Sequence, residues 1–94
     1  YFFLFMQYMV EEAQRMGFST EAARQLVQET ALGAAQMVIA NPETELATLR
    51  AQVTSKGGTT AAAINAFEEG KLADLVSVAM QAAQHRAEEM ETLF

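Results

Sequence analysis

Glycines and hydroxyl side chains are concentrated in one short segment of the chain, VTSKGGTT, at residues 53–60. Gly57 and Gly58 allow positive φ values and a close approach of the backbone to a ligand. The alanine-rich run that follows has a helical composition, so its first free N–H groups and the positive end of its dipole would face the segment. An anion is the ligand that such a helix start favours. The hydroxyl donors at the same point are Ser55, Thr59 and Thr60.

The same segment has a simpler interpretation. Two glycines followed by threonine are a common way to turn a chain and cap a helix, with no ligand involved. A nucleotide-binding loop does not fit, because Lys56 precedes the glycines instead of following them and no hydrophobic strand leads into the segment. The residues alone therefore leave two alternatives, an anion site and a purely structural turn.

The other side chains capable of chemistry do not form a site. His85, the only histidine, has the polar neighbours Gln81, Gln84, Glu88 and Glu89 within a helical turn, so we expect a surface histidine and not a general base. The adjacent pairs Glu11–Glu12 and Glu68–Glu69 point to different sides of a helix and do not make an acid/base dyad. We predict no metal site, because these groups lack the convergent spacing of ligands on helices.

The elements around the segment all have helical patterns, so we predict an all-α fold, a helical bundle. The expected helices cover residues 1–16, closed by Gly17 in a left-handed conformation, and residues 20–40, capped by Ser19 or Thr20 and stopped by Asn41 and Pro42. We expect a short helix at 45–52, which sets the position and direction of the glycine segment that follows it. The remaining helices are expected from Thr60 to residue 69, ended by Gly70, and over residues 72–90.

The apolar positions predict which faces are buried. We expect Leu46, Leu49 and Val53 to point inward, as well as Ile64 and Phe67, and the six methionines to fill the core. Leu26, Thr30, Gly33 and Met37 share one face of the second helix, where flanking alanines would let another helix approach closely; simple tolerance of Gly33 is the alternative. The stripe of the last helix consists of Leu72, Leu75, Val76, Ala79, Ala82, Ala83, Arg86 and Met90.

Composition indicates one small domain, residues 1–94, that buries apolar surface against a second copy. The chain is 51% hydrophobic, has no cysteine and offers no metal-ligand cluster to stabilise a small core. The first ten residues, YFFLFMQYMV, are apolar on nearly every side of a helix, and such a helix must be surrounded. We therefore expect this half of the first helix to lie at a subunit interface.

Charge and pattern argue against several other classes. The net charge is −6 with scattered bases, which does not suit nucleic acid. The apolar start is too short for a membrane span and lacks the basic segment of a signal peptide. Because it begins in mid-pattern without methionine or a cap, we interpret the chain as an excised domain. The lack of cysteine fits a reducing compartment, and we expect a cytoplasmic location.

The run LRAQVTSKGGTTAAAINAFEEGKLADLVSVAMQAA, residues 49–83, closely resembles the C-terminal region of pyrroline-5-carboxylate reductase, the last enzyme of proline biosynthesis. The opening YFFLF and the ALGAA at residues 31–35 are similar to that family as well, so the resemblance spans nearly all of the chain. Its most specific part is LR-x-x-VTS-x-GGTT. The sequence departs from many members at Lys56, where they have proline; this bears on the rigidity of the loop and leaves its hydroxyls and glycines in place.

The resemblance implies a function. Members of the family join an N-terminal Rossmann domain, which binds NADPH or NADH, to a helical domain that dimerises by interlocking its helices, and some dimers assemble into larger rings. By similarity, backbone N–H groups of residues 55–60 and the Ser55 hydroxyl would hold the carboxylate of 1-pyrroline-5-carboxylate, with Gly57, Gly58 and Thr59 forming the loop. Thr60 would reach the ring nitrogen as the catalytic residue, and hydride from the nicotinamide would give proline.

Two consequences follow for this chain. It contains no GxGxxG, so NADP or NAD would be bound by the absent domain and these residues alone should be inactive. The alternative from a different class is a purely structural helical oligomerisation module with no small-molecule site.

Overall fold

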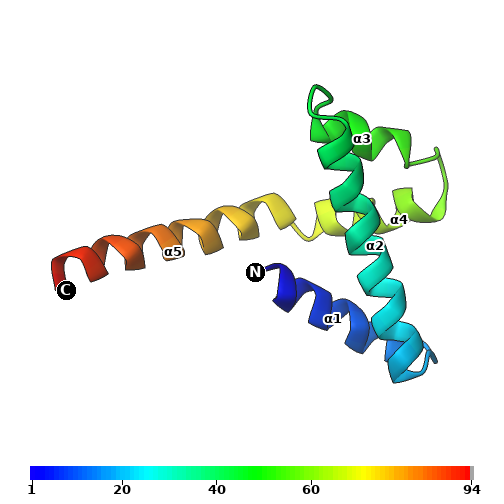
Figure 1. Ribbon diagram of the computed structural model, residues 1–94, viewed down its shortest axis with the longest axis horizontal. Coiled ribbons are helices and arrows are strands. Elements are labelled where there is room, and N and C mark those ends of the chain that lie inside the picture. The colour runs from blue at the N-terminus through cyan, green and yellow to red at the C-terminus, as the bar shows by residue number, and fades with distance from the viewer. Residues whose placement is uncertain (94) are drawn as a thin grey trace. The chain divides into compact units, whose positions relative to one another are not determined.

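The computed structural model describes residues 1–93, which form five α-helices and contain no β-strand. They are α1 (Phe2–Arg15), α2 (Thr20–Ala40), α3 (Leu46–Gln52), α4 (Thr59–Glu69) and α5 (Leu72–Leu93) (Figure 1). The predicted all-α class is confirmed. The helix bounds agree within one or two residues of the prediction except at the end of α5, which continues three residues past Met90.

The turn between α1 and α2 follows from its residues. Gly17 has φ of +109°, and its N–H donates to the Gln14 carbonyl while the Phe18 N–H donates to the Ala13 carbonyl. These two bonds are the Schellman arrangement that a left-handed glycine allows at a helix end. The predicted role of Gly17 is therefore confirmed.

The start and end of α2 are each fixed by one side chain. Ser19, and not Thr20, is the N-cap, and its Oγ accepts a hydrogen bond of 3.1 Å from the Ala22 N–H. At the other end the Asn41 Nδ2 donates to the Met37 carbonyl at 2.8 Å, directly before Pro42 stops the helix.

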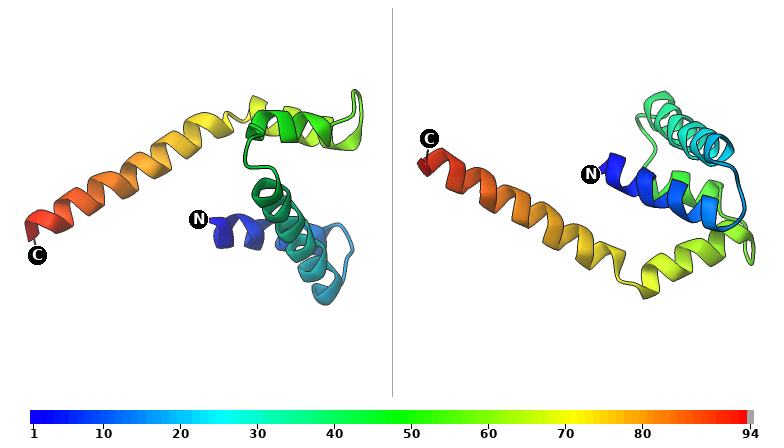
Figure 2. Two further views of the ribbon diagram at one scale, coloured as in Figure 1. Left: turned by 45° about the horizontal axis from the view of Figure 1, so that its top comes forward. Right: turned by 90° about the horizontal axis from the view of Figure 1, so that it is seen from below.

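Two compact units divide the chain, residues 1–50 and 51–94, and the prediction of a single domain stays a prediction. In the first unit α1 packs on α2, as the views of Figure 2 show, and the buried apolar residues are Ala23 and Val27 of α2 together with Leu49 of α3. In the second unit α4 and α5 contain no buried residue. Within its described residues, 51–93, the second unit therefore has no apolar core of its own.

Several predicted core positions are exposed in this single chain. Leu46, Val53 and Phe67 are exposed, and only Leu49 and the half-buried Ile64 point inward as expected. The prediction that the methionines fill the core is wrong for the isolated chain, since all but Met6 are exposed. The pattern located apolar faces correctly but could not tell a face buried within the chain from one left for another partner.

The apolar first half of α1 is exposed as well. Phe2 and Phe3 have 82% and 88% of their surface accessible, although aromatic rings bring the largest gain on burial. Within residues 1–93 no helix is both long and apolar enough to cross a membrane.

Candidate functional site

The glycine segment forms a tight turn that leads directly into α4. The Gly58 N–H donates to the Ser55 carbonyl at 3.0 Å, which closes a four-residue turn with Lys56 and Gly57 at its centre. Gly57 has φ of +73°, a backbone conformation that residues with a side chain rarely adopt. It occupies the third turn position, where glycine is favoured. The turn therefore needs the first glycine for its backbone conformation.

Gly58 is favoured for a different reason, because a side chain at this position would be crowded by Ser55. It is the N-cap of α4 with an extended backbone, φ −85° and ψ −179°. A Cβ built on it would collide with the Ser55 Oγ and stand 3.2 Å from the Ser55 carbonyl oxygen. The Ser55 hydroxyl thus lies against the backbone at the start of α4, in the space that a side chain at Gly58 would take.

The start of α4 has backbone donors without protein acceptors. The Ala62 N–H makes the first intrahelical bond, 3.1 Å to the Gly58 carbonyl, and glycine provides no side chain to cap the N–H groups before it. In residues 1–93 nothing accepts from the N–H groups of Thr59, Thr60 and Ala61, and the first turn has no acidic residue. The positive end of this helix dipole is therefore uncompensated by the described part of the chain.

The start of α2 shows the opposite arrangement. There Ser19 caps the helix with its own hydroxyl, and Glu21 places a carboxylate in the first turn. In α2 the chain's own side chains thus interact with the N–H groups and the positive dipole end of the helix start. The start of α4 has no such side chains and can bind an external anion.

The structure gathers the predicted site residues at one place. Ser55 and Gly57 lie in the turn, Gly58 caps the helix, and Thr59 and Thr60 are its first two residues; α4 begins one residue earlier than predicted. The hydroxyl-bearing residues Ser55, Thr59 and Thr60 are exposed and thus accessible to a ligand. Lys56 is exposed at the second turn position and makes no ion pair with residues 1–93.

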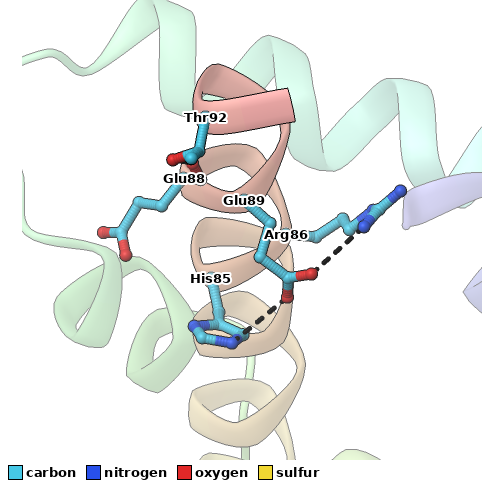
Figure 3. A network of polar contacts seen from close by, with 5 residues as sticks. All are labelled: His85, Arg86, Glu88, Glu89 and Thr92. Atoms are coloured by element: carbon cyan, nitrogen blue, oxygen red, sulfur yellow. Dashed lines mark hydrogen bonds and ion pairs between the residues drawn. The ribbon is translucent and has the colours of Figure 1, made fainter. Parts of the chain in front are cut away.

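The remaining candidates behave as surface residues. His85 has 75% of its side chain accessible, and its Nε2 lies 3.2 Å from the Glu89 carboxylate, which also takes a bond of 3.1 Å from Arg86 (Figure 3). This exposed network is the solvated face that the sequence predicted. No group of three histidine, cysteine, aspartate or glutamate side chains within residues 1–93 could hold a metal ion.

The class of protein follows from three features: an all-α chain, an exposed apolar first helix, and an uncapped helix start that can bind an anion. Together they define a helical association domain with one candidate ligand site. Residues 1–90 match the family model described as pyrroline-5-carboxylate reductase dimerisation. The chain belongs to this family, and the resemblance found in the sequence is confirmed.

Relatives and a solved structure agree with the family. The chain is 65% identical over its whole length to the pyrroline-5-carboxylate reductase of Vibrio alginolyticus, covering 35% of that protein. It is 52% identical to the reductase of Pasteurella multocida, covering 34% of it. The fold matches a pyrroline-5-carboxylate reductase from Coxiella burnetii with a TM-score of 0.88 and 43% identity, over 95% of this chain and 33% of that one. The chain thus spans about a third of the length of these relatives.

Proposed function

We propose that this chain is the dimerising and substrate-binding part of a cytoplasmic pyrroline-5-carboxylate reductase, which reduces 1-pyrroline-5-carboxylate to L-proline. The observation that carries the proposal is the uncapped start of α4, where free N–H groups and hydroxyl side chains meet. Its chemistry suits a carboxylate, and the family membership says which carboxylate to expect.

Each site residue has a role in this proposal. The N–H groups of the first turn and the Ser55 hydroxyl bind the substrate carboxylate, while Gly57 and Gly58 keep the backbone close enough for those bonds. Thr59 supplies one of the N–H groups. Thr60 donates its hydroxyl to the ring nitrogen of the imine and thereby sets the orientation of the ring.

NADPH or NADH, when bound by the part of the reductase outside this chain, would supply the hydride for the imine carbon, and the ring nitrogen would take a proton from water. The residues here contribute position and orientation, which can lower a barrier by several kcal/mol, on the order of 7–11 in the best intramolecular cases. Positioning needs no acid/base dyad or metal, in keeping with the surface character of His85. The 94-residue chain alone is expected to be inactive.

Dimerisation is the second half of the proposal. The apolar first half of α1 is exposed, α5 has no buried residue over 22 positions, and the matching family model describes a dimerisation domain. A second copy that covers these faces would bury apolar surface worth about 25 cal/mol per Å². In this proposal such dimers assemble further into larger rings, as the family resemblance implies.

The test of the enzymatic part uses the full-length reductase that contains this chain. We expect NADPH oxidation that depends on 1-pyrroline-5-carboxylate, and a Thr60→Ala variant with a turnover reduced by about tenfold or more, in line with a lost orienting hydrogen bond to a reacting group. Thr44→Ala, outside the site, serves as the control. An unchanged turnover in Thr60→Ala would remove the role assigned to this residue.

A structural turn remains the competing function, because the Gly58–Ser55 bond closes the turn without any ligand. Titration of the full-length protein with proline, followed by NMR of the Gly57, Gly58 and Thr60 amides, separates the two. Shifts at these amides support the carboxylate site, and their absence at saturating proline favours the structural module.

A further inference from the structure

Lys56 is the only charged side chain between Arg50 and Glu68, in a chain whose net charge is −6. It occupies the second position of the turn, and its side chain is exposed. In the described part of the chain Arg15 and Arg86 each pair with a glutamate three residues away, at 2.7 and 3.1 Å, whereas Lys56 makes no ion pair. The charge of this lysine is therefore not neutralised by residues 1–93.

The helix start beside Lys56 is positive as well. The turn that the Gly58 N–H closes on the Ser55 carbonyl, at 3.0 Å, places Lys56 two residues before the N-cap of α4. The first turn of α4 has no acidic residue that would offset the helix dipole, whereas the start of α2 has Glu21. A cation near the N-terminal end of a helix is unfavourable, so an anion bound here would interact favourably with both the dipole and the lysine.

We propose that Lys56 is a specificity-determining residue of the carboxylate site, whose ammonium group raises the affinity for an anionic substrate. The inference rests on the proposed function and adds a charge to a site otherwise made of N–H groups and hydroxyls. Lysine is a flexible, hydrated point charge, so it attracts the carboxylate without a fixed contact. Because many members of the family have proline at this position, the attraction is a feature of this chain and not of the shared loop.

The step that this attraction affects is the capture of the substrate. The carboxylate keeps its charge while the imine is reduced, so Lys56 interacts with it equally in the ground state and in the transition state. Binding of that kind lowers KM and leaves kcat unchanged. The attraction is also screened by salt, as expected for an exposed charge.

Steady-state kinetics of the full-length reductase test the charge. At an ionic strength of about 0.1 M, Lys56→Gln is expected to raise the KM for 1-pyrroline-5-carboxylate about two- to fivefold, the range of an exposed ion pair, with the same kcat. Lys56→Glu, which repels the substrate, should raise this KM about tenfold, and Lys56→Arg should restore the wild-type value. At about 1 M, where the Debye length is about 3 Å, the KM values of Lys56→Gln and wild type should converge.

Lys71→Gln is the matched control, since it removes the same charge beyond the other end of α4. The 11 residues of that helix separate the two lysine backbones by about 16 Å, more than the Debye length of about 10 Å at about 0.1 M. The KM of this variant for 1-pyrroline-5-carboxylate should stay close to the wild-type value. The KM for NADPH should not change in any of these variants; a rise confined to NADPH would show that Lys56 acts on the cofactor and would overturn the proposal.

The outcomes separate this inference from the proposed function. A reductase that does not oxidise NADPH in the presence of 1-pyrroline-5-carboxylate contradicts the proposed function itself. An active reductase in which Lys56→Gln changes neither the KM for this substrate nor its salt dependence contradicts only the inference. Equal losses in Lys56→Gln and Lys56→Arg would also overturn it, because they would show that the lysine acts through the conformation of the turn and not through its charge.

Discussion

The Ser55 hydroxyl lies in the space that a Cβ on Gly58 would occupy, so the serine and the second glycine of the turn depend on each other. The absence of a side chain at Gly58, the N-cap of α4, leaves room for this hydroxyl next to the helix start. A serine in this position can act on the same ligand as the N–H groups of the first turn of α4, which is the arrangement that a carboxylate with two oxygens requires.

The dependence of these two residues predicts the effect of Gly58→Ala. The added methyl displaces the hydroxyl and presses on the Ser55 carbonyl, so we expect a loss of about 1–3 kcal/mol in the free energy of unfolding, as for other overpacked sites. In the full-length reductase the KM for 1-pyrroline-5-carboxylate should rise. Chemical denaturation and steady-state kinetics measure the two effects.

A double-mutant cycle checks the cause. Ser55→Ala removes the hydroxyl with which the methyl collides, so Gly58→Ala should cost less in that background, with a coupling of about 0.5 kcal/mol or more. Additive costs would show that the Ser55 hydroxyl is not what limits the space at Gly58.

Lys56 occupies the second position of the turn, where proline is favoured and where many members of the family have it. Its backbone is not among the positive-φ residues, and its N–H makes no backbone hydrogen bond outside the helices. Lys56→Pro should therefore raise the free energy of unfolding by about 0.4–1 kcal/mol through a less flexible unfolded chain. Thermal unfolding by circular dichroism measures this. Gly57→Pro is the matched control, and its φ of +73° predicts destabilisation; equal effects of the two prolines would contradict the turn geometry.

The ends of the helices show what the sequence could and could not predict. Gly17 was expected to be left-handed and is, because a helix that must reverse direction at once needs that conformation. Gly70 was expected to end α4 and does, but it keeps φ of −77°, and the left-handed residue is Lys71 with φ of +59°. Either of these two adjacent residues can adopt the left-handed conformation. Which one does so depends on the direction in which α5 leaves the turn, and local composition does not determine that direction.

Lys71 consequently carries backbone strain that glycine would not. A left-handed conformation costs a non-glycine residue about 1–2 kcal/mol. We expect Lys71→Gly to stabilise the chain by up to about 1 kcal/mol, since the glycine gives back part of this gain through greater freedom in the unfolded state. Gly70→Ala is the control: its added Cβ would stand 3.3 Å from the Ala66 carbonyl oxygen, so no gain is expected. Thermal unfolding compares them, and a destabilised Lys71→Gly would contradict the strain.

The turn and the helix start at residues 55–60 were predictable from the sequence, whereas the core was not; the ligand-binding roles of these residues stay a prediction. The loop residues form a local turn, and its glycines, hydroxyls and helix start are adjacent in sequence. Burial is a non-local property: the stripe that contains Leu26 and Met37 is exposed, while the small residues Ala23 and Val27 on another face of α2 are buried. Sequence periodicity finds both faces of α2 but does not say which one faces α1.

The last prediction concerns Gly33, for which the sequence left close packing and simple tolerance as alternatives. An added Cβ meets nothing within 4 Å in the single chain, so within the monomer Gly33→Ala should stabilise α2 by about 1 kcal/mol. If a second copy packs on this face, the same methyl obstructs its approach. We therefore expect Gly33→Ala to raise helix stability at high dilution and to weaken the dimer in sedimentation equilibrium. Because the two effects have opposite signs, a variant that tightens the dimer as well would show that Gly33 is only tolerated and that the second copy packs elsewhere.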